Sequence, residues 1–289
     1  MNKNTHSMVD ETGPSSSSSS SIDKKRKRIA DSDFESHLGN VNSLSDDDEL
    51  LSLEKSLTFS DTLVALRMMR AQFPKLEKVY VKPFVLRSQL YSSIKDRTQV
   101  DRELELLKRD KVLRVFKLNT GQDDHAVMFL EDYIHQIDIV SKKIATKNDG
   151  DFAVFGWFKS HVMMSKLEPS IAHQELCSLL AAGGKVKDEH ISLLVNAGII
   201  TRQFIDPNMY WFAIPNVGPI LKGISKGRKE LLSLLNRRKY KEMMLALLEK
   251  KRLQFSPLDM RFHLRDLIGS GHLRTFQTPT GIVVRVLKD

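Results

Sequence analysis

Residues 267–286 read LIGSGHLRTFQTPTGIVVRV. The apolar pair Leu267-Ile268 is followed by the break Gly269-Ser270-Gly271, and two apolar runs then flank the turn Thr278-Pro279-Thr280-Gly281. β-Branched and aromatic residues favour strands, whereas Pro and Gly favour the turn between them. The stretch therefore predicts the end of a helix followed by a β-hairpin.

The same order occurs twice upstream, in residues 104–130 and 193–214. The breaks at positions 110, 198 and 271 lie 88 and 73 residues apart, a spacing longer than solenoid periods, so we expect tandem small domains. Helix, helix, hairpin is the winged-helix order. We predict a mainly α protein with small antiparallel β-hairpins (α+β), built as three tandem winged-helix domains. The predicted boundaries are 56–132, 133–216 and 217–289, after a tail at 1–55.

Composition excludes several classes of protein. The chain has 289 residues, of which 41% are hydrophobic, and one cysteine, Cys177. A single cysteine rules out a disulfide framework and a multi-cysteine zinc site. His173 and Cys177 could form a metal pair, but nothing nearby completes four ligands, so we expect neither metal nor cofactor. No run approaches the ~18 apolar residues of a membrane span, and no secretory signal is apparent. We expect an intracellular protein that does not bind membranes.

The net charge is unevenly distributed. The whole chain carries +9, and residues 1–55 carry −4, which leaves +13 on residues 56–289. A folded region this basic usually binds a polyanion, because displacing counterions from phosphates favours association. The alternative is charge that only maintains solubility.

The N-terminal 55 residues are of low complexity, with an unbroken serine run at 15–21. Such a segment buries too little apolar surface to offset its ordering entropy, so we predict disorder. It contains the basic cluster Lys24-Lys25-Arg26-Lys27-Arg28, which is typical of nuclear-import signals. A non-specific polyanion-binding arm is the alternative. We expect a nuclear protein.

The most basic part of the chain is 217–252, with 11 Lys or Arg against 3 Glu. Apolar spacing predicts two helices there, 217–235 and 237–252. A solvated helix face normally mixes charge signs, and this one scarcely does, which favours phosphate binding. The predicted DNA contacts are Lys222, Lys226, Arg228, Lys229, Arg237, Arg238, Lys239 and Lys241, helped by Arg97, Arg102, Arg261 and Arg265.

The helices in the recognition position differ in charge. In the first module we predict a helix that starts at Thr98, with Asp101 completing a capping-box-like start. In the second module, the helix 188–196 begins with Asp188 and Glu189 and has no Lys or Arg. That helix would repel phosphate, so the second module is predicted to be structural or protein-binding.

No catalytic machinery is apparent. The run His263-Leu264-Arg265-Asp266-Leu267 imitates a kinase catalytic loop, but the Asn expected four residues after the Asp is Ser270. No glycine-rich phosphate loop and no Walker loop are present. Kinase catalysis needs all these parts together, so we predict a non-enzyme.

Several segments resemble the serine/threonine-protein kinase 19 family, and the resemblance spans roughly residues 60–289. It implies tandem winged helices, a nuclear location and double-stranded DNA binding. It also implies a role in transcription-coupled nucleotide excision repair, with stalled RNA polymerase II and its repair factors. The kinase in the name is not supported by motifs. The matching segments are Val85–Ser92, Asp96-Arg97-Thr98 with Asp101-Arg102, Leu194–Gly198, Lys226-Gly227-Arg228, Arg238-Lys239-Tyr240 and Asp266–Gly269.

The function we predict is a DNA-binding scaffold that contacts phosphates without reading sequence. A protein-interaction adapter whose basic face meets an acidic partner is the main alternative, and an atypical kinase is a third. The sequence leaves open whether the protein is a monomer or a homodimer.

Overall fold

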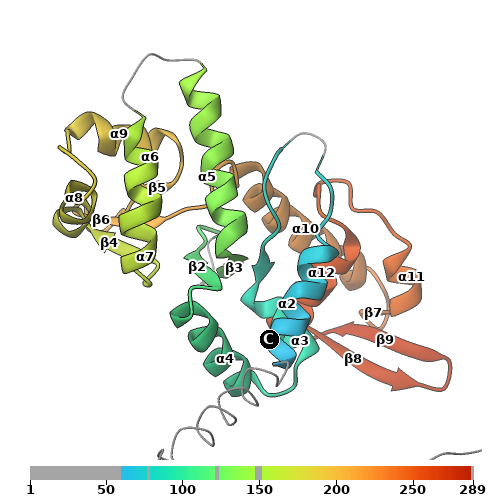
Figure 1. Ribbon diagram of the computed structural model, residues 1–289. Helices are drawn as coiled ribbons and strands as arrows, with labels where there is room; N and C mark the ends of the chain where they lie inside the picture. The colour runs from blue at the N-terminus through green and yellow to red at the C-terminus, as the bar shows by residue number, and fades with distance from the viewer. Residues whose placement is uncertain (1–59, 77–78, 121–123, 147–151, 288–289) are drawn as a thin grey trace, which may run out of the picture. The chain divides into compact units, whose positions relative to one another are not determined.

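The computed structural model describes residues 60–76, 79–120, 124–146 and 152–287 (Figure 1). Residues Glu54–Asp289 form one compact unit, to which all the elements below belong. The predicted tail and its import cluster at 24–28 lie outside the described residues. In the described ranges, no helix is long and apolar enough to cross a bilayer.

Three small sheets share one topology. Each is antiparallel and three-stranded, with the orders β1-β3-β2, β4-β6-β5 and β7-β9-β8. In each, a short strand follows one helix or more, and two further helices separate it from the hairpin. The hairpins and the α+β class were predicted. The short first strands were not, because two or three residues carry no alternation signal.

The first repeat begins at α2, where the Ser60 hydroxyl caps the helix by accepting from the Leu63 N–H at 3.3 Å. The cap expected at Thr98 is wrong. Asp96 takes that role, since its carboxylate accepts from the N–H groups of Thr98 and Gln99 at 2.9 and 3.2 Å. The elements are α2 (Asp61–Ala71), β1 (Val85–Leu86), α3 (Arg87–Ser93), α4 (Arg97–Arg109), β2 (Leu113–Lys117) and β3 (His125–Phe129).

In the second repeat, a π-helical turn, η1, separates α6 from α7. Gly183 and Gly184 follow α8 because Trp157 fills their space: a Cβ there would lie 2.3 and 2.5 Å from the indole. The elements are α5 (Leu130–Ala145), α6 (Ala153–Trp157), η1 (Phe158–Val162), α7 (Met163–Ser165), β4 (Ser170–Ala172), α8 (His173–Ala181), α9 (Asp188–Asn196), β5 (Ile200–Arg202) and β6 (Met209–Phe212).

The third repeat corrects one prediction. The expected helix 237–252 is a turn, a strand and a five-residue helix, because β7 completes the sheet by pairing Glu242 with Arg285. Lys241 has a φ of 52°, which reverses the chain before that strand. The elements are α10 (Gly218–Asn236), β7 (Glu242–Met244), α11 (Leu245–Glu249), α12 (Met260–Gly269), β8 (Leu273–Thr278) and β9 (Gly281–Val286).

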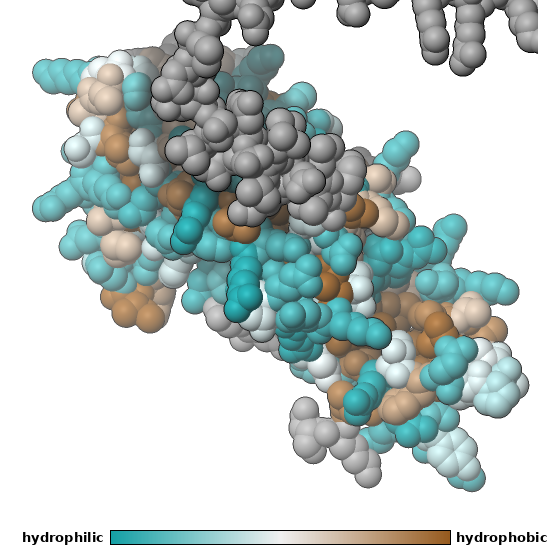
Figure 2. Space-filling view, turned by 60° about the horizontal axis from the view of Figure 1, so that its bottom comes forward, coloured by the Kyte–Doolittle hydropathy of each residue, from teal (hydrophilic) through white to brown (hydrophobic). Residues whose placement is uncertain are grey.

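The first and third repeats are packed tightly together through α3 and α12. A Cβ on Gly269 would lie 1.6 Å from the Ser88 carbonyl oxygen, so only glycine allows the two helices this close approach. Phe84 and Phe262 meet edge to face at 6.5 Å, inside a core that also includes residues of the second repeat. Helix α12 occupies the position of a recognition helix, but it is largely buried because it packs against α3. On the face shown in Figure 2, hydrophilic residues predominate and hydrophobic ones form separate patches.

Candidate nucleic-acid interface

Helix α10 carries a row of basic side chains along its solvent side. The cations recur at helical spacing, and the opposite side is buried through Ile220, Ile224 and Leu231. The row spans about 22 Å at ~1.5 Å per residue, which corresponds to about six base pairs of B-DNA. Its members, all exposed, are Lys222, Lys226 and Lys229 on the helix and Arg237 at its C-cap.

The row continues into the turn between α10 and β7. Arg238, Lys239 and Lys241 are exposed there, and the Lys239 ammonium lies 5.2 Å from the centre of the Tyr240 ring. Seven predicted contact residues therefore follow one another along α10 and its turn. We call them the basic surface: Lys222, Lys226, Lys229, Arg237, Arg238, Lys239 and Lys241.

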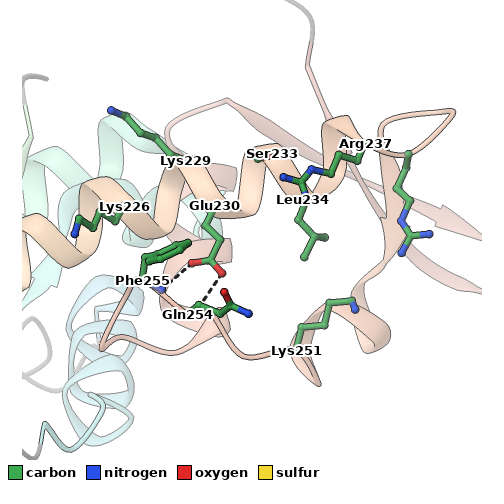
Figure 3. Close-up of a pocket in the computed structure, with 10 residues that line it drawn as sticks. Lys226, Lys229, Glu230, Ser233, Leu234, Arg237, Lys251, Gln254 and Phe255 are labelled. Carbon is green, nitrogen blue, oxygen red and sulfur yellow. Dashed lines mark hydrogen bonds between the residues drawn. The ribbon is translucent and has the colours of Figure 1, made fainter.

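A groove opens beside this surface (Figure 3). Its volume is about 910 Å³, and the loop between α11 and α12 forms its second wall with Lys251, Gln254 and Phe255. Lys251 adds a cation that is absent from the predicted contacts, and Phe255 is also absent from them. Neither could have been assigned from the sequence, because only the fold brings this loop back against α10.

Among the described residues that line the groove, Glu230 is the one acidic residue. Its carboxylate accepts from the backbone N–H groups of Gln254 at 2.8 Å and Phe255 at 3.0 Å. Its charge therefore fixes the loop and is partly compensated by two donors, so the groove remains cationic.

Arg228 was predicted to contact DNA, but the fold buries its side chain. Its side chain is only 9% exposed, and the guanidinium binds Asp266 and Asp124, each with an N–O distance of 2.6 Å. Burial acts to lower the pKa of Arg228, but the hydrogen bonds to both carboxylates raise it on balance. This arginine therefore connects the first and third repeats and is not available to DNA.

The four helper residues lie on other helices. Arg97 donates to the Gly269 carbonyl at 3.0 Å, and Arg265 donates to the Gln72 side chain at 2.7 Å. Arg261 lies 3.7 Å from a Glu249 oxygen, and Arg102 is exposed on α4. Arg97 and Arg265 thus also connect the first and third repeats, and none of the four lies in the basic surface.

The kinase-like run lies on a helix. Asp266 is completely buried on α12, where its carboxylate accepts from the Ser88 hydroxyl at 2.6 Å and pairs with Arg228. A carboxylate in this setting cannot reach the hydroxyl of a bound substrate. Among the described residues, no three His, Cys, Asp or Glu side chains are grouped as a metal site.

His263 makes the stability of the fold depend on pH. Burial, and then the charge of Arg228, lower its pKa from 6.5 to about 4. The unfolded chain therefore takes up the proton first, and this contribution to stability is complete above pH 6.5 and is lost as the pH falls towards 4. We expect a loss of about 2 kcal/mol at pH 5. Urea unfolding at pH 7.5 and pH 5 measures it, and His263→Gln should lose less on acidification. An equal loss in both proteins would contradict the assignment.

The chain was compared with known proteins. The family model described as "Inactive serine-threonine protein kinase 19" matches residues 48–286. The chain belongs to this family. The resemblance drawn from the sequence is thereby confirmed, and the family's own description is of an inactive kinase.

Relatives in this family are named Winged helix repair factor 1. The human protein is 30% identical over 207 residues, which cover 71% of this chain and 76% of the human one. The Dictyostelium discoideum protein is 26% identical over 84% of this chain and 69% of its own length. The Xenopus laevis protein is 29% identical over 92% of this chain and 99% of its own length. Their name describes winged-helix repair factors.

Proposed function

We propose that this chain is a non-catalytic nuclear scaffold that binds double-stranded DNA. It acts in transcription-coupled nucleotide excision repair, with stalled RNA polymerase II and its repair factors as partners. The observation that carries the DNA-binding part is the basic surface, seven exposed cations in succession on α10 and its turn. The repair part rests on the family and on the name of its relatives.

The scaffold consists of three tandem winged-helix domains at 56–132, 133–216 and 217–289. Support for this division comes from the helix, short strand, two helices and hairpin that recur in each repeat. The tight α3–α12 packing makes the first and third domains act as one body.

DNA binds along α10 rather than to a recognition helix. Two such helices are unsuited to a major groove: α12 is largely buried, and α9 begins with the exposed acids Asp188 and Glu189. Lysine and arginine on one helix and a turn suit the phosphate backbone, which carries no sequence information. Binding should therefore be independent of sequence and sensitive to salt.

Mobility-shift titrations with duplexes of unrelated sequence test this proposal. We expect the full-length chain to shift each duplex with affinities within about threefold of one another, and to release them as salt is raised. If no duplex shifts at low salt, the basic surface serves an acidic protein partner, and the chain is an adapter. A strong preference for one duplex would also contradict the proposal, because it would require base readout.

A further inference from the structure

Phe255 is a large aromatic side chain with open space around it. Its side chain is 62% exposed, and it lies beneath α10 between Lys226 and Glu230 (Figure 3). A second hollow of about 470 Å³ shares Gln254 and Phe255 as lining and extends to Lys75. The ring therefore stands between two open spaces. Exposure of a single apolar residue is common, so exposure alone does not define a site.

The backbone around Phe255 is held from both sides. On one side, Glu230 accepts the N–H groups of Gln254 and Phe255. On the other side, the Ser256 hydroxyl lies 2.8 Å from Nε2 of His263 and accepts from the Leu258 N–H. The loop is thus anchored to α10 and α12, and a ligand that binds the ring need not pay for ordering it.

The charges around the ring suit a ligand with regularly spaced anions. Five cations line the same groove, and the carboxylate of Glu230 is engaged by backbone donors. An exposed aromatic ring beside a track of cations is the arrangement that proteins use for single-stranded nucleic acid. The cations are Lys226, Lys229, Arg237, Arg238 and Lys251.

We propose that this groove binds an unpaired nucleotide segment, with one base stacked on Phe255 and its phosphates on the flanking cations. Bases within a duplex stack on one another and offer no free face, so this site distinguishes unpaired from paired DNA. The inference rests on the proposed function, since Lys226, Lys229, Arg237 and Arg238 also belong to the basic surface. It predicts that duplex with a single-stranded tail binds more tightly than the same duplex with blunt ends.

Fluorescence titration of the full-length chain tests the site with two labelled probes, a blunt duplex and that duplex with a single-stranded tail. Phe255→Ala should weaken binding of the tailed probe by about fivefold or more, and should leave binding of the blunt duplex within about twofold. Phe255→Trp should retain the preference for the tail, whereas Phe255→Leu, which is apolar without a ring, should not. Phe204→Ala removes a phenylalanine that is fully exposed and lies outside the groove, and it should change neither affinity.

The outcomes separate this inference from the proposed function. If wild type binds the blunt duplex but Phe255→Ala leaves the tail preference intact, the stacking site is wrong and duplex binding stands. If Phe255→Ala weakens both probes equally, the ring supports the fold rather than a base. If neither probe binds, both proposals are wrong. Binding of an Asp/Glu-rich peptide that depends on Phe255, with the probes unaffected, would assign the groove to a protein partner.

Discussion

Replacing Asp266 by alanine is expected to lower the free energy of unfolding by about 3–5 kcal/mol. The Asp266 carboxylate is fully buried and holds both the Arg228 guanidinium and the Ser88 hydroxyl. Without it, Arg228 retains the more exposed Asp124 carboxylate, but its largely buried charge loses both contacts that it makes with Asp266. The destabilisation comes mainly from leaving the Arg228 charge buried with less compensation, not from the loss of the ion pair itself.

Urea unfolding of matched variants measures this effect. Glu242→Ala breaks an ion pair with Arg285 at a similar distance of 2.6 Å, but on the surface, and should cost less than about 1 kcal/mol. The triple variant Asp124→Asn, Arg228→Met, Asp266→Leu removes all three charges and should recover much of the loss, because side chains of similar volume can replace a buried ionic cluster. A cost below about 1 kcal/mol for Asp266→Ala would show that the network does not hold the repeats together.

Reversing the charge of Arg237, Arg238 and Lys239 to glutamate is expected to weaken duplex binding by at least about 100-fold near physiological salt. The three residues are exposed in the turn after α10, so the fold should be unaffected. Three phosphate contacts are lost, and three negative charges then face the negatively charged DNA backbone. In cells lacking the protein, this variant should also fail to restore RNA synthesis after ultraviolet damage, whereas wild type should restore it.

A matched control distinguishes the loss of local phosphate contacts from the effect of a changed net charge. Reversing Arg67, Lys142 and Lys143, which are exposed on α2 and α5, changes the net charge by the same amount. This control should weaken binding by less than about tenfold, since it acts only through the long-range field. Equal losses in the two triple variants would mean that the basic surface is not the binding site. Full repair activity of a variant that does not bind DNA would contradict the repair role of DNA binding.

The three hairpins could be predicted because each is encoded by apolar runs around a polar turn within about 20 residues. The Ser60 cap and the acidic start of α9 are likewise local signals. The strand β7 was missed because Glu242-Met243-Met244 has no strand preference of its own; pairing with β9 decides its conformation.

In the candidate site, too, some features follow from the local sequence and others only from the fold. The exposed cations of α10 follow from helical spacing alone. The burial of Arg228 does not, because its partners Asp124 and Asp266 come from the first and third repeats and are 104 and 38 residues away. Helical spacing places Arg228 beside the buried stripe of α10, four residues after Ile224 and three before Leu231, but the local sequence does not show which carboxylates meet it there. Phe255 was missed for the same reason, since its setting depends on the loop's return to α10.

The salt dependence of duplex binding tests the central claim most directly. The slope of log K against log salt concentration should be about −5 to −7 if most of the seven cations of the basic surface neutralise phosphates. The Arg237, Arg238 and Lys239 triple variant should have a slope shallower by about three units, measured at low salt where it still binds. A slope near zero in the wild type, or an unchanged slope in the variant, would contradict the account.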